Sequence, residues 1–289
     1  MDIRNIYRQR FGSIRWSITR GGRLGLPLAL ICVLAGSAGD PKSLAPAAKV
    51  GDISLSVTLL TKDGTITAGE PLLARIEIAN LSGHNIQHSM GNDLWKTTCL
   101  EVRDQEGKLV AGTPRPPYRE GGWAGWRRLR TGETSSKVWV VTSLYQFEEP
   151  GTYTVRVQEL DHSEDLPVIA EDTTTVRVLP LDASRLEARC EEIFQPMRKG
   201  GCSKTGIPLG VRAHALYSVS HDVVLPYLDW MARKWDDRYA CRAIRRVGTE
   251  KAQALISTLA AREDKVGVAA RQALDMPLRS RSIFWAMGD

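Results

Sequence analysis

The sequence lacks the short motifs that identify the common enzyme classes. It has no G-x-S-x-G turn, no phosphate-binding P-loop and no dinucleotide-binding glycine pattern. Its longest apolar stretch is shorter than the roughly 20 residues that a membrane-spanning helix needs. These absences favour a non-enzymatic protein, for which we expect no catalytic residues and no cofactor. The alternative is an enzyme whose active site is assembled from residues of two domains at their junction.

Cysteine is scarce as well, with five residues in 289, one of which is Cys32 near the N-terminus. The remaining four are Cys99, Cys190, Cys202 and Cys241. Their spacings match no zinc motif, so we expect no metal centre. In an exported protein they could form disulfides, and Cys190 with Cys202 is the favoured pair because the two are close in sequence. The alternative is four unpaired thiols.

Positive charge is concentrated at the N-terminus. The first 38 residues contain six arginines and one acidic residue, and their apolar stretch "LGLPLALICVLAGSAG" ends in small residues. This arrangement is typical of a secretory signal, so we expect a signal peptide over 1–38 and a linker over 39–49. The predicted location is therefore periplasmic or secreted. An uncleaved N-terminal membrane anchor is the alternative.

The rest of the chain has almost no net charge. After residue 38 there are 33 basic and 32 acidic residues, so the basic isoelectric point gives no reason to expect a nucleic-acid partner. The charge is nevertheless divided, with a net of −4 over 39–180 and +5 over 181–289. These opposite charges could dock the two parts on each other, or the basic part could meet an acidic partner.

Apolar and polar residues alternate between residues 50 and 180. In "ISLSVTL" one face holds Ile53, Leu55, Val57 and Leu59. The segments 74–78, 153–157 and 174–178 alternate in the same way, and turn sequences such as "KDGT" and "EEPGT" separate them. A period of two with these turns predicts short antiparallel strands, and hence a β-sandwich over 50–180.

The segment "LYQFEEPGTYTVRV", residues 144–157, has a Pro-Gly turn with Tyr153 entering the next strand. It resembles the corner between two strands of bacterial immunoglobulin-like and fibronectin-like domains. The resemblance implies that Tyr153 packs or bonds across that corner. The segment 50–180 holds only Cys99, so the inter-sheet disulfide of antibody domains is excluded. The fold itself implies little about function.

A segment rich in tryptophan and arginine, "GGWAGWRRLR" at 121–130, follows "PRPPY" at 114–118. It separates the strands expected at 97–104 and 136–142, so we expect a long loop, with a short edge strand at "WAGWRRL". The candidate ligand-binding residues are Tyr118, Trp123, Trp126, Arg127 and Arg128. The alternative is that the tryptophans cover the end of the sandwich while the arginines pair with nearby acids.

After residue 180 the apolar period changes to that of a helix, and a repeat emerges. The segment 212–228 resembles 241–259, a shift of 28 residues pairs positions such as Ala215 with Ala243 and Leu228 with Ile256, and a third, partial copy begins at 265. We expect helices at 184–197, 209–218, 222–234, 237–246, 249–262 and 265–275, the first beginning at an Asp182 or Ser184 cap.

The segments "LGVRAHAL", "AIRRVGTEKAQALISTL" and "VGVAARQAL" resemble short bacterial HEAT-like repeats. The resemblance implies an all-α HEAT-like repeat domain over 181–289 that binds a protein or peptide. The candidate partner-binding face is Arg238, Arg242, Arg245, Arg246 and Lys251. The array is short, and the alternative is a helical domain that only supports the sandwich.

Two other groups resemble chemical sites only superficially. His84 and His88 are four residues apart with Asp93 nearby, but their segment "SGHNIQHSMGND" has no helical period, and we expect a polar loop. Ser220, His221 and Asp222 are adjacent at an expected helix start, where they do not face one another. We expect Ser220 and Asp222 to be helix-capping residues.

The sequence thus predicts a multidomain protein, an all-β immunoglobulin-like sandwich followed by an all-α HEAT-like helical repeat domain. Its expected function is that of an exported, non-enzymatic adaptor with a protein or peptide partner. The alternative is a carbohydrate- or cell-wall-binding module, or a protease-inhibitor-like module, that acts through the Trp/Arg loop. The sequence leaves the oligomeric state open.

Overall fold

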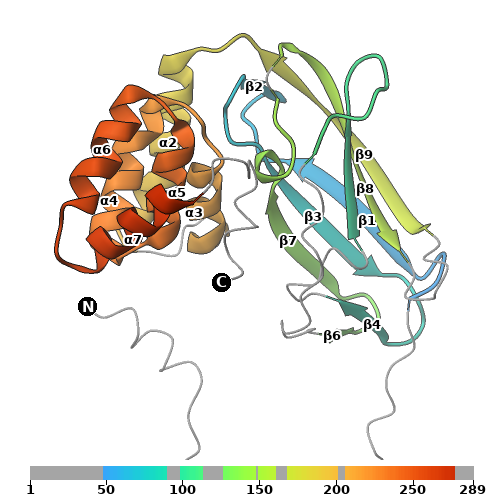
Figure 1. Cartoon of the computed structure of the whole chain (residues 1–289). Coiled ribbons are helices and arrows are strands. Elements are labelled where there is room, and N and C mark those ends of the chain that lie inside the picture. Colours follow the sequence, from blue (N-terminus) through green and yellow to red (C-terminus); the bar gives the residue numbers. More distant parts are fainter. Residues whose placement is uncertain are drawn as a thin grey trace, which may run out of the picture. The chain divides into compact units, whose positions relative to one another are not determined.

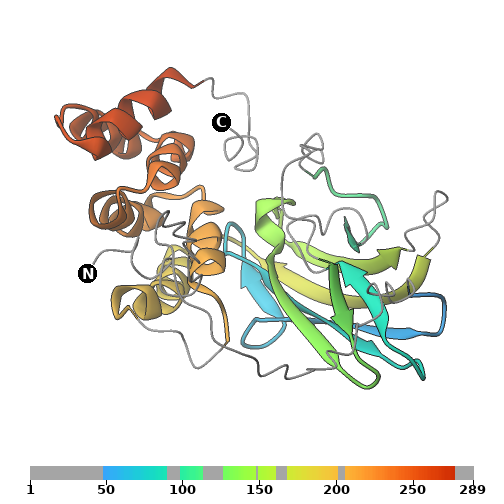
Figure 2. The ribbon, with the colours of Figure 1, turned by 90° about the horizontal axis from the view of Figure 1, so that it is seen from below.

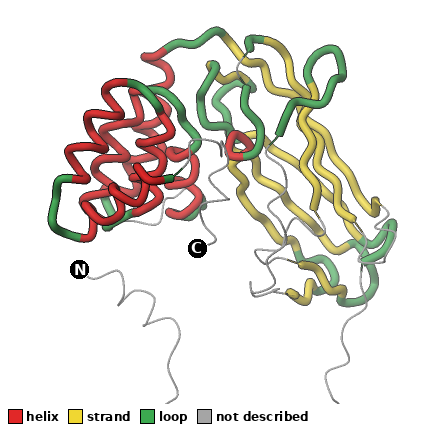
Figure 3. Tube along the Cα trace, viewed as in Figure 1, coloured by secondary structure: helices red, strands yellow, loops and turns green. Residues whose placement is uncertain are grey.

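The chain has a β-rich region followed by a helical region (Figures 1 and 3). The computed structural model describes residues 48–89, 98–112, 126–147, 149–160, 168–200 and 206–276. The strands, blue to yellow in sequence order, and the helices, gold to red, also segregate in the view of Figure 2. Within the described residues, no helix is long and apolar enough to cross a membrane.

The strands form three sheets. They are β1 (Ile53–Leu59), β2 (Thr65–Thr67), β3 (Leu73–Asn80), β4 (Ile86–Ser89), β5 (Thr98–Arg103), β6 (Trp126–Leu129), β7 (Thr134–Val140), β8 (Gly151–Leu160) and β9 (Val168–Leu179). One sheet has the order β1-β3-β7, a second has the order β2-β9-β8-β5, and β4 pairs with β6. All pairings between these strands are antiparallel except that of β2 with β9.

The alternation in the sequence corresponds to burial. In β1 the side chains of Ile53, Leu55 and Val57 are buried and the serines between them are exposed, as predicted. Apolar side chains from both large sheets belong to one hydrophobic cluster. The backbone N–H of Val57 in β1 donates to the Asp172 carboxylate in β9 at 2.7 Å, which ties one sheet to the other.

Strand β7 is buried on both faces near its end, which the sequence pattern did not reveal. Trp139 joins the cluster between the sheets, whereas Val138 and Val140 join the cluster of the helical region. Leu73 at the start of β3 also belongs to the helical cluster. Successive side chains of a strand point to opposite faces, so one short apolar run serves two cores.

The predicted tyrosine corner is present. The Tyr153 hydroxyl donates to the carbonyl oxygen of Glu149 at 2.9 Å. Its ring also meets that of Phe147 edge to face, with centroids 5.1 Å apart. This one side chain therefore closes the turn before β8 through both a hydrogen bond and apolar packing.

One local prediction in the β region was wrong, and one strand ends earlier than predicted. The segment expected to be a polar loop contains β4, because Ile86 is fully buried and its strand pairs with β6. The strand expected at 136–142 ends at Val140, and Val141–Ser143 form a 3-10 turn. The Ser143 hydroxyl donates to the carbonyl oxygen of Val140 at 2.6 Å, which stabilises that turn.

The helices lie close to the predicted ranges. They are α2 (Ala183–Arg198), α3 (Leu209–Tyr217), α4 (Leu225–Trp235), α5 (Arg238–Val247), α6 (Glu250–Ala260) and α7 (Lys265–Asp275), with a 3-10 turn η3 (Asp222–Val224) before α4. Asp182 caps α2 by accepting from the backbone N–H groups of Ser184 and Arg185, at 2.9 and 3.1 Å. Of the two predicted caps, Asp182 is therefore the one used.

The start of the helix expected at 222–234 differs from the prediction. Its first turn is η3, because Pro226 lies in the first turn of α4 and lacks a backbone N–H. The capping group is His221, whose Nδ1 accepts from the Val223 N–H at 3.2 Å. Ser220 and Asp222 are not the caps that we expected. The Asp222 carboxylate instead accepts a hydrogen bond from the Thr249 hydroxyl.

The 28-residue period is matched by burial. The aligned positions are Ala215 and Ala243, Leu216 and Ile244, Val219 and Val247, Val224 and Ala252, and Leu228 and Ile256, and every one of these side chains is buried. Small alanines allow neighbouring helices to approach, and the larger aliphatic side chains fill the seam between them.

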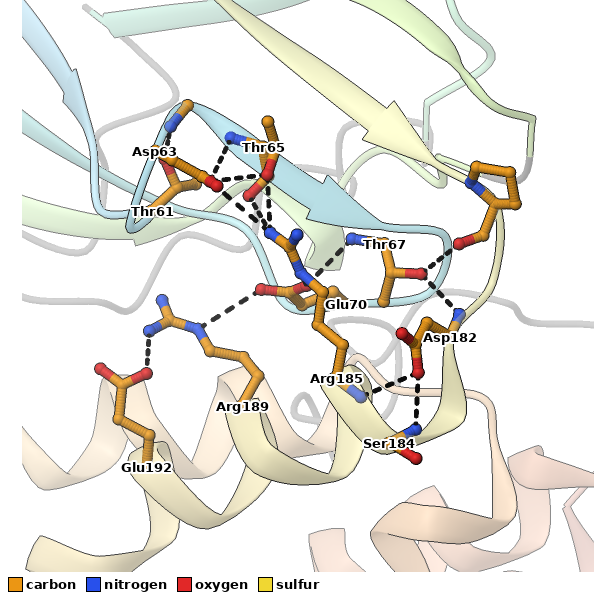
Figure 4. A network of polar contacts seen from close by, with 12 residues as sticks. Thr61, Asp63, Thr65, Thr67, Glu70, Asp182, Ser184, Arg185, Arg189 and Glu192 are labelled. Atoms are coloured by element: carbon orange, nitrogen blue, oxygen red, sulfur yellow. Dashed lines mark hydrogen bonds and ion pairs between the residues drawn. The ribbon is translucent and has the colours of Figure 1, made fainter.

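A polar network joins α2 to the β region (Figure 4). Arg185 donates from Nε to the Glu70 carboxylate at 3.2 Å and from Nη2 to the Thr65 carbonyl oxygen at 2.8 Å. Glu70 also accepts from the Thr67 N–H at 2.9 Å. Arg189 lies within ion-pair range of Glu70, at 3.9 Å, and donates to the carbonyl oxygen of Leu60 at 2.7 Å. This buried carboxylate is therefore surrounded by donors from both regions.

Candidate functional site

The arginines of α5 form one stripe on the helix face opposite its core. The helix begins at Asp237, whose carboxylate accepts from the backbone N–H groups of Tyr239 and Ala240, and it ends at Gly248 in the left-handed conformation. Ala240, Cys241, Ala243, Ile244 and Val247 are buried. Arg238, Arg242, Arg245 and Arg246 occupy positions i, i+4, i+7 and i+8, which share the opposite face. We call these four residues the α5 arginine face.

Tyr239 holds two members of this face. The guanidinium carbon of Arg238 lies 5.0 Å from the centre of the Tyr239 ring, and that of Arg242 lies 5.6 Å from it. Arg238 also donates from Nη2 to the Tyr239 hydroxyl at 3.0 Å. Cation–π contacts of this kind favour a guanidinium beside a ring. The ring thus orients two cations without neutralising them.

Several N–H groups of the α5 arginine face are buried without an acceptor. Arg245 donates from Nη1 to the Gln253 amide oxygen of α6 at 2.5 Å. The other buried nitrogens are Arg242 Nη1, Arg245 Nε, and Arg246 Nε and Nη2, and within the described chain none of these four has a hydrogen-bond partner. An unsatisfied buried donor costs about 1–3 kcal/mol of folding free energy, so these N–H groups destabilise the folded protein unless an acceptor is supplied.

Burial also acts on the charge of Arg246. Desolvation lowers the pKa of Arg246 to about 10, which still leaves the guanidinium protonated at neutral pH. A buried cation with open donors is well suited to receive an anionic acceptor.

Lys251, the fifth candidate on the helical region, differs from the arginines. It is at the start of α6, its side chain is 80% exposed, and its ammonium lies 3.9 Å from the Asp222 carboxylate. The structure therefore gives Lys251 an acidic neighbour and places it in solvent. Tyr239 and Gln253 were missed in the sequence, although Tyr239 is next to Arg238 and the α5 periodicity could have indicated it.

The Trp/Arg loop is only partly described. Tyr118 and Trp123 lie outside the described residues, and of Trp126 and Arg127 only the backbone, in β6, is described. The predicted edge strand is confirmed, since β6 pairs with β4. Arg128 is exposed in that strand, and Asn85, with its amide oxygen turned towards it, accepts from its Nη2 and Nε at 2.6 and 3.1 Å.

The end of strand β6 is anchored to the rest of the β region by one buried side chain and one hydrogen bond. Leu129 is fully buried, and its carbonyl oxygen accepts from the Asn80 side-chain amide at 3.0 Å. The same amide donates to the carbonyl oxygen of His84 at 2.8 Å. Leu129 therefore serves the core, and among the loop candidates Arg128 is the one whose described side chain faces solvent.

Two cysteines of the helical region, Cys190 and Cys241, are buried. Burial raises the pKa of the Cys190 thiol to about 12 and that of Cys241 to about 11, so neither is a thiolate at neutral pH. Cys190 is unbridged here, and its predicted partner Cys202 lies outside the described residues. The pairing stays a prediction.

The histidine and aspartate group weighed as a metal site is only partly described. Asp93 and the side chain of His88 lie outside the described residues, and His84 is exposed. Across the described ranges, no group of three or more His, Cys, Asp or Glu residues could hold a metal ion.

Comparisons with known proteins identify no family for this chain. No protein-family model matches it, and no curated protein matches it. Solved structures that resemble part of it include the CARDB domain of a Pyrococcus furiosus protein, with 14% identity, a TM-score of 0.25, and coverage of 46% of this chain and 93% of that domain. A sporulation control protein of Bacillus subtilis, Spo0M, shows 8% identity, a TM-score of 0.28, and coverage of 51% of this chain and 56% of its own.

A third similar structure is a β-glucosidase from Listeria innocua, with 16% identity and a TM-score of 0.25. The match covers 43% of this chain but only 16% of the glucosidase. These likenesses are too weak to carry any argument about activity. What the fold establishes is a β-rich region followed by a helical one.

Proposed function

We propose that this protein is an exported, non-enzymatic adaptor that binds a protein or peptide through the α5 arginine face. The observation that carries the proposal is the set of buried guanidinium N–H groups without acceptors on Arg242, Arg245 and Arg246. A partner that supplies acceptors would recover the cost of burying these donors, which gives specific binding at this place.

The finer fold assignment is part of the same proposal. The β region is an immunoglobulin-like sandwich, which is supported by the hydrophobic cluster shared by both sheets and by the Tyr153 corner. The helical region is a short HEAT-like array, which is supported by the buried positions that recur every 28 residues. Such arrays typically use an extended surface for binding.

The binding experiment uses the full chain, because Leu73, Val138 and Val140 of the β region belong to the helical core and truncation would expose them. A photo-crosslinking residue replaces the exposed Ser257, one turn beyond Gln253 on α6. The matched control carries it at the exposed Thr173 on β9. We expect one defined envelope protein to crosslink from position 257 but not from position 173. This crosslink should be lost when the protein also carries Arg242→Gln/Arg246→Gln. Equal crosslinking from both positions would reject the proposal.

Export rests on the arginine-rich, apolar N-terminal segment, and it has its own test. Fractionation of cells that express the full chain should find it outside the cytoplasm, and deletion of residues 1–38 should retain it inside. Cytoplasmic retention of the full chain would remove this part of the proposal.

A second candidate function uses the Trp/Arg loop as a platform for carbohydrate or cell wall, or as a protease-inhibiting loop. The observation in its favour is the separate β4–β6 pair, with Arg128 exposed on it. Replacing Trp123 and Trp126 by alanine separates the candidates. Loss of binding to isolated cell wall, with an unchanged unfolding midpoint, would favour the platform.

A further inference from the structure

The four arginines of the α5 arginine face have no ion-pair partner among the described residues, although acidic residues are near in sequence. Three of those acids are engaged elsewhere. Asp237 accepts from the backbone at the start of α5 and from the Tyr217 hydroxyl, Asp229 pairs with Arg233, and Asp264 pairs with Arg262. These three carboxylates thus serve a helix cap, a tyrosine hydroxyl or other cations. The described residues supply no acceptor to Arg242 Nη1 or to Arg246 Nε and Nη2, and we therefore consider an acceptor from another molecule.

The spacing of the arginines indicates the form of that molecule. Arg242 and Arg246 are one helical turn apart, a rise of about 6 Å along the axis. Alternate residues of an extended peptide are about 6.6 Å apart and point to the same side. An extended segment with carboxylates at alternate positions therefore matches a row of guanidinium groups on one helix.

The chemistry of the donors favours carboxylate. A guanidinium presents parallel N–H groups that a carboxylate accepts in pairs, and in Arg246 both Nε and Nη2 are buried without an acceptor. The groups lie in a row along α5, which suits a chain of anions better than one compact anion. A nucleic-acid ligand would need a strongly basic surface, whereas the chain after residue 38 has 33 basic and 32 acidic residues.

We propose that Arg242, Arg245 and Arg246 bind an extended acidic peptide segment whose carboxylates alternate along its length. This inference rests on the proposed function, since it specifies what the adaptor face binds. Tyr239 is a positioning residue, because its ring holds Arg238 and Arg242 beside the row.

The test uses the full-length protein and fluorescent nine-residue synthetic peptides, followed by fluorescence anisotropy at two salt concentrations. One peptide alternates glutamate with serine, and the matched peptide has glutamine in place of each glutamate. We expect the glutamate peptide to bind at least tenfold more tightly than the glutamine peptide, and binding to weaken with salt. Arg242→Gln/Arg246→Gln should reduce that affinity at least tenfold.

Two further variants keep the test specific. Arg246→Lys retains the charge but not the paired N–H groups, so it should give an intermediate affinity. Arg233→Gln removes an arginine of α4 that already pairs with Asp229, and it should leave peptide affinity unchanged. Circular dichroism and the urea unfolding midpoint confirm that each variant is folded.

Three results would overturn the inference. The first is equal affinity for the two peptides, and the second is unchanged affinity in folded Arg242→Gln/Arg246→Gln protein. The third is Arg246-dependent binding of inorganic phosphate or of phosphatidylglycerol vesicles that is tighter than binding of the glutamate peptide. The crosslinking experiment separates the two proposals. A partner captured from Ser257 without peptide binding leaves the adaptor function and removes the acidic segment, whereas failure of both removes both.

Discussion

The arginines on α2 and those on α5 have opposite surroundings. Arg185 and Arg189 of α2 meet the buried Glu70 and the backbone carbonyl oxygens of Thr65 and Leu60. The α5 arginine face meets a tyrosine ring, one amide oxygen and no carboxylate in the described structure. The α2 group therefore has a buried counter-charge in Glu70, although Arg189 Nε is itself buried without a hydrogen bond, whereas the α5 group has no counter-charge among the described residues.

The two groups therefore differ in electrostatic surroundings, since one has a buried carboxylate beside it and the other has none among the described residues. The sequence offered two meanings for the opposite charges of its two regions, docking on each other or an acidic partner. The α2 arginines and Glu70 account for the first meaning. The α5 arginine face leaves the second meaning to be tested, since among the described residues it pairs with no acid of the β region.

The largest expected effect comes from breaking the satisfied group. Glu70→Gln should lower the free energy of unfolding by about 3 kcal/mol, because it leaves Arg185 and Arg189 without their buried counter-charge. Urea unfolding followed by tryptophan fluorescence measures this loss. Glu171→Gln is the control, since Glu171 pairs with Arg156 at the surface and should matter little. Equal effects of the two changes would contradict the comparison.

The next effect has the opposite sign. Arg246→Met should raise the free energy of unfolding by about 1 kcal/mol, because it removes two buried donors that have no acceptor. The same variant should lose at least tenfold in affinity for the alternating glutamate peptide. Arg189→Met is the matched variant on α2, and it should destabilise the protein. If both methionine variants destabilise it equally, the two groups do not differ as we infer.

A smaller effect tests the role of the ring. Tyr239→Ala should weaken glutamate-peptide binding by a factor of about 2–5, which corresponds to a cation–π contribution of about 0.5–1 kcal/mol. Tyr239→Phe keeps the ring and should bind almost as well as the unchanged protein. Anisotropy titrations compare the three proteins, and equal loss in both variants would assign the role to the hydroxyl instead.

The smallest effect concerns an exposed pair outside both groups. Arg262, and after it the Gly267 backbone N–H, lower the pKa of Asp264 to about 2 from 3.8. A carboxyl with a depressed folded pKa stabilises the protein above its unfolded pKa, and this contribution is lost as pH falls from about 4 towards 2. Asp264→Asn should therefore lower the thermal midpoint slightly at pH 7, with a difference that shrinks as pH falls towards 2 and disappears below pH 2. A difference that persists there would exclude the carboxylate as its cause.

Much of the fold could be predicted because local patterns follow burial directly. The alternation in "ISLSVTL" became β1, and the 28-residue period became matched buried positions. The helix starts were readable where an Asp or Thr precedes the first turn, as at Asp182 and Thr249. Strand β4 could not be found in this way, because the burial of Ile86 depends on its distant partner β6.

The residues of the candidate site could be predicted from the sequence, but the contacts that their side chains make could not. Helical spacing placed Arg238, Arg242, Arg245 and Arg246 on one face, since the core residues of α5 define the other. Spacing gave no indication that Lys251 has an acidic neighbour in Asp222, or that Arg245 reaches Gln253. Those contacts join residues on different elements, and they depend on how the helices pack.

The amino-acid sequence by itself determined the succession of strands and helices, their buried faces and the arginine stripe of α5. Those features arise from periodicity and capping, which act over a few neighbouring residues. The tertiary structure alone decided that Val138 and Val140 serve the helical core, and that Glu70 neutralises Arg185 and Arg189 while Arg242 and Arg246 remain without a carboxylate. Whether a charge is satisfied depends on what packing brings within about 4 Å of it, and that neighbour can lie a hundred residues away in the chain.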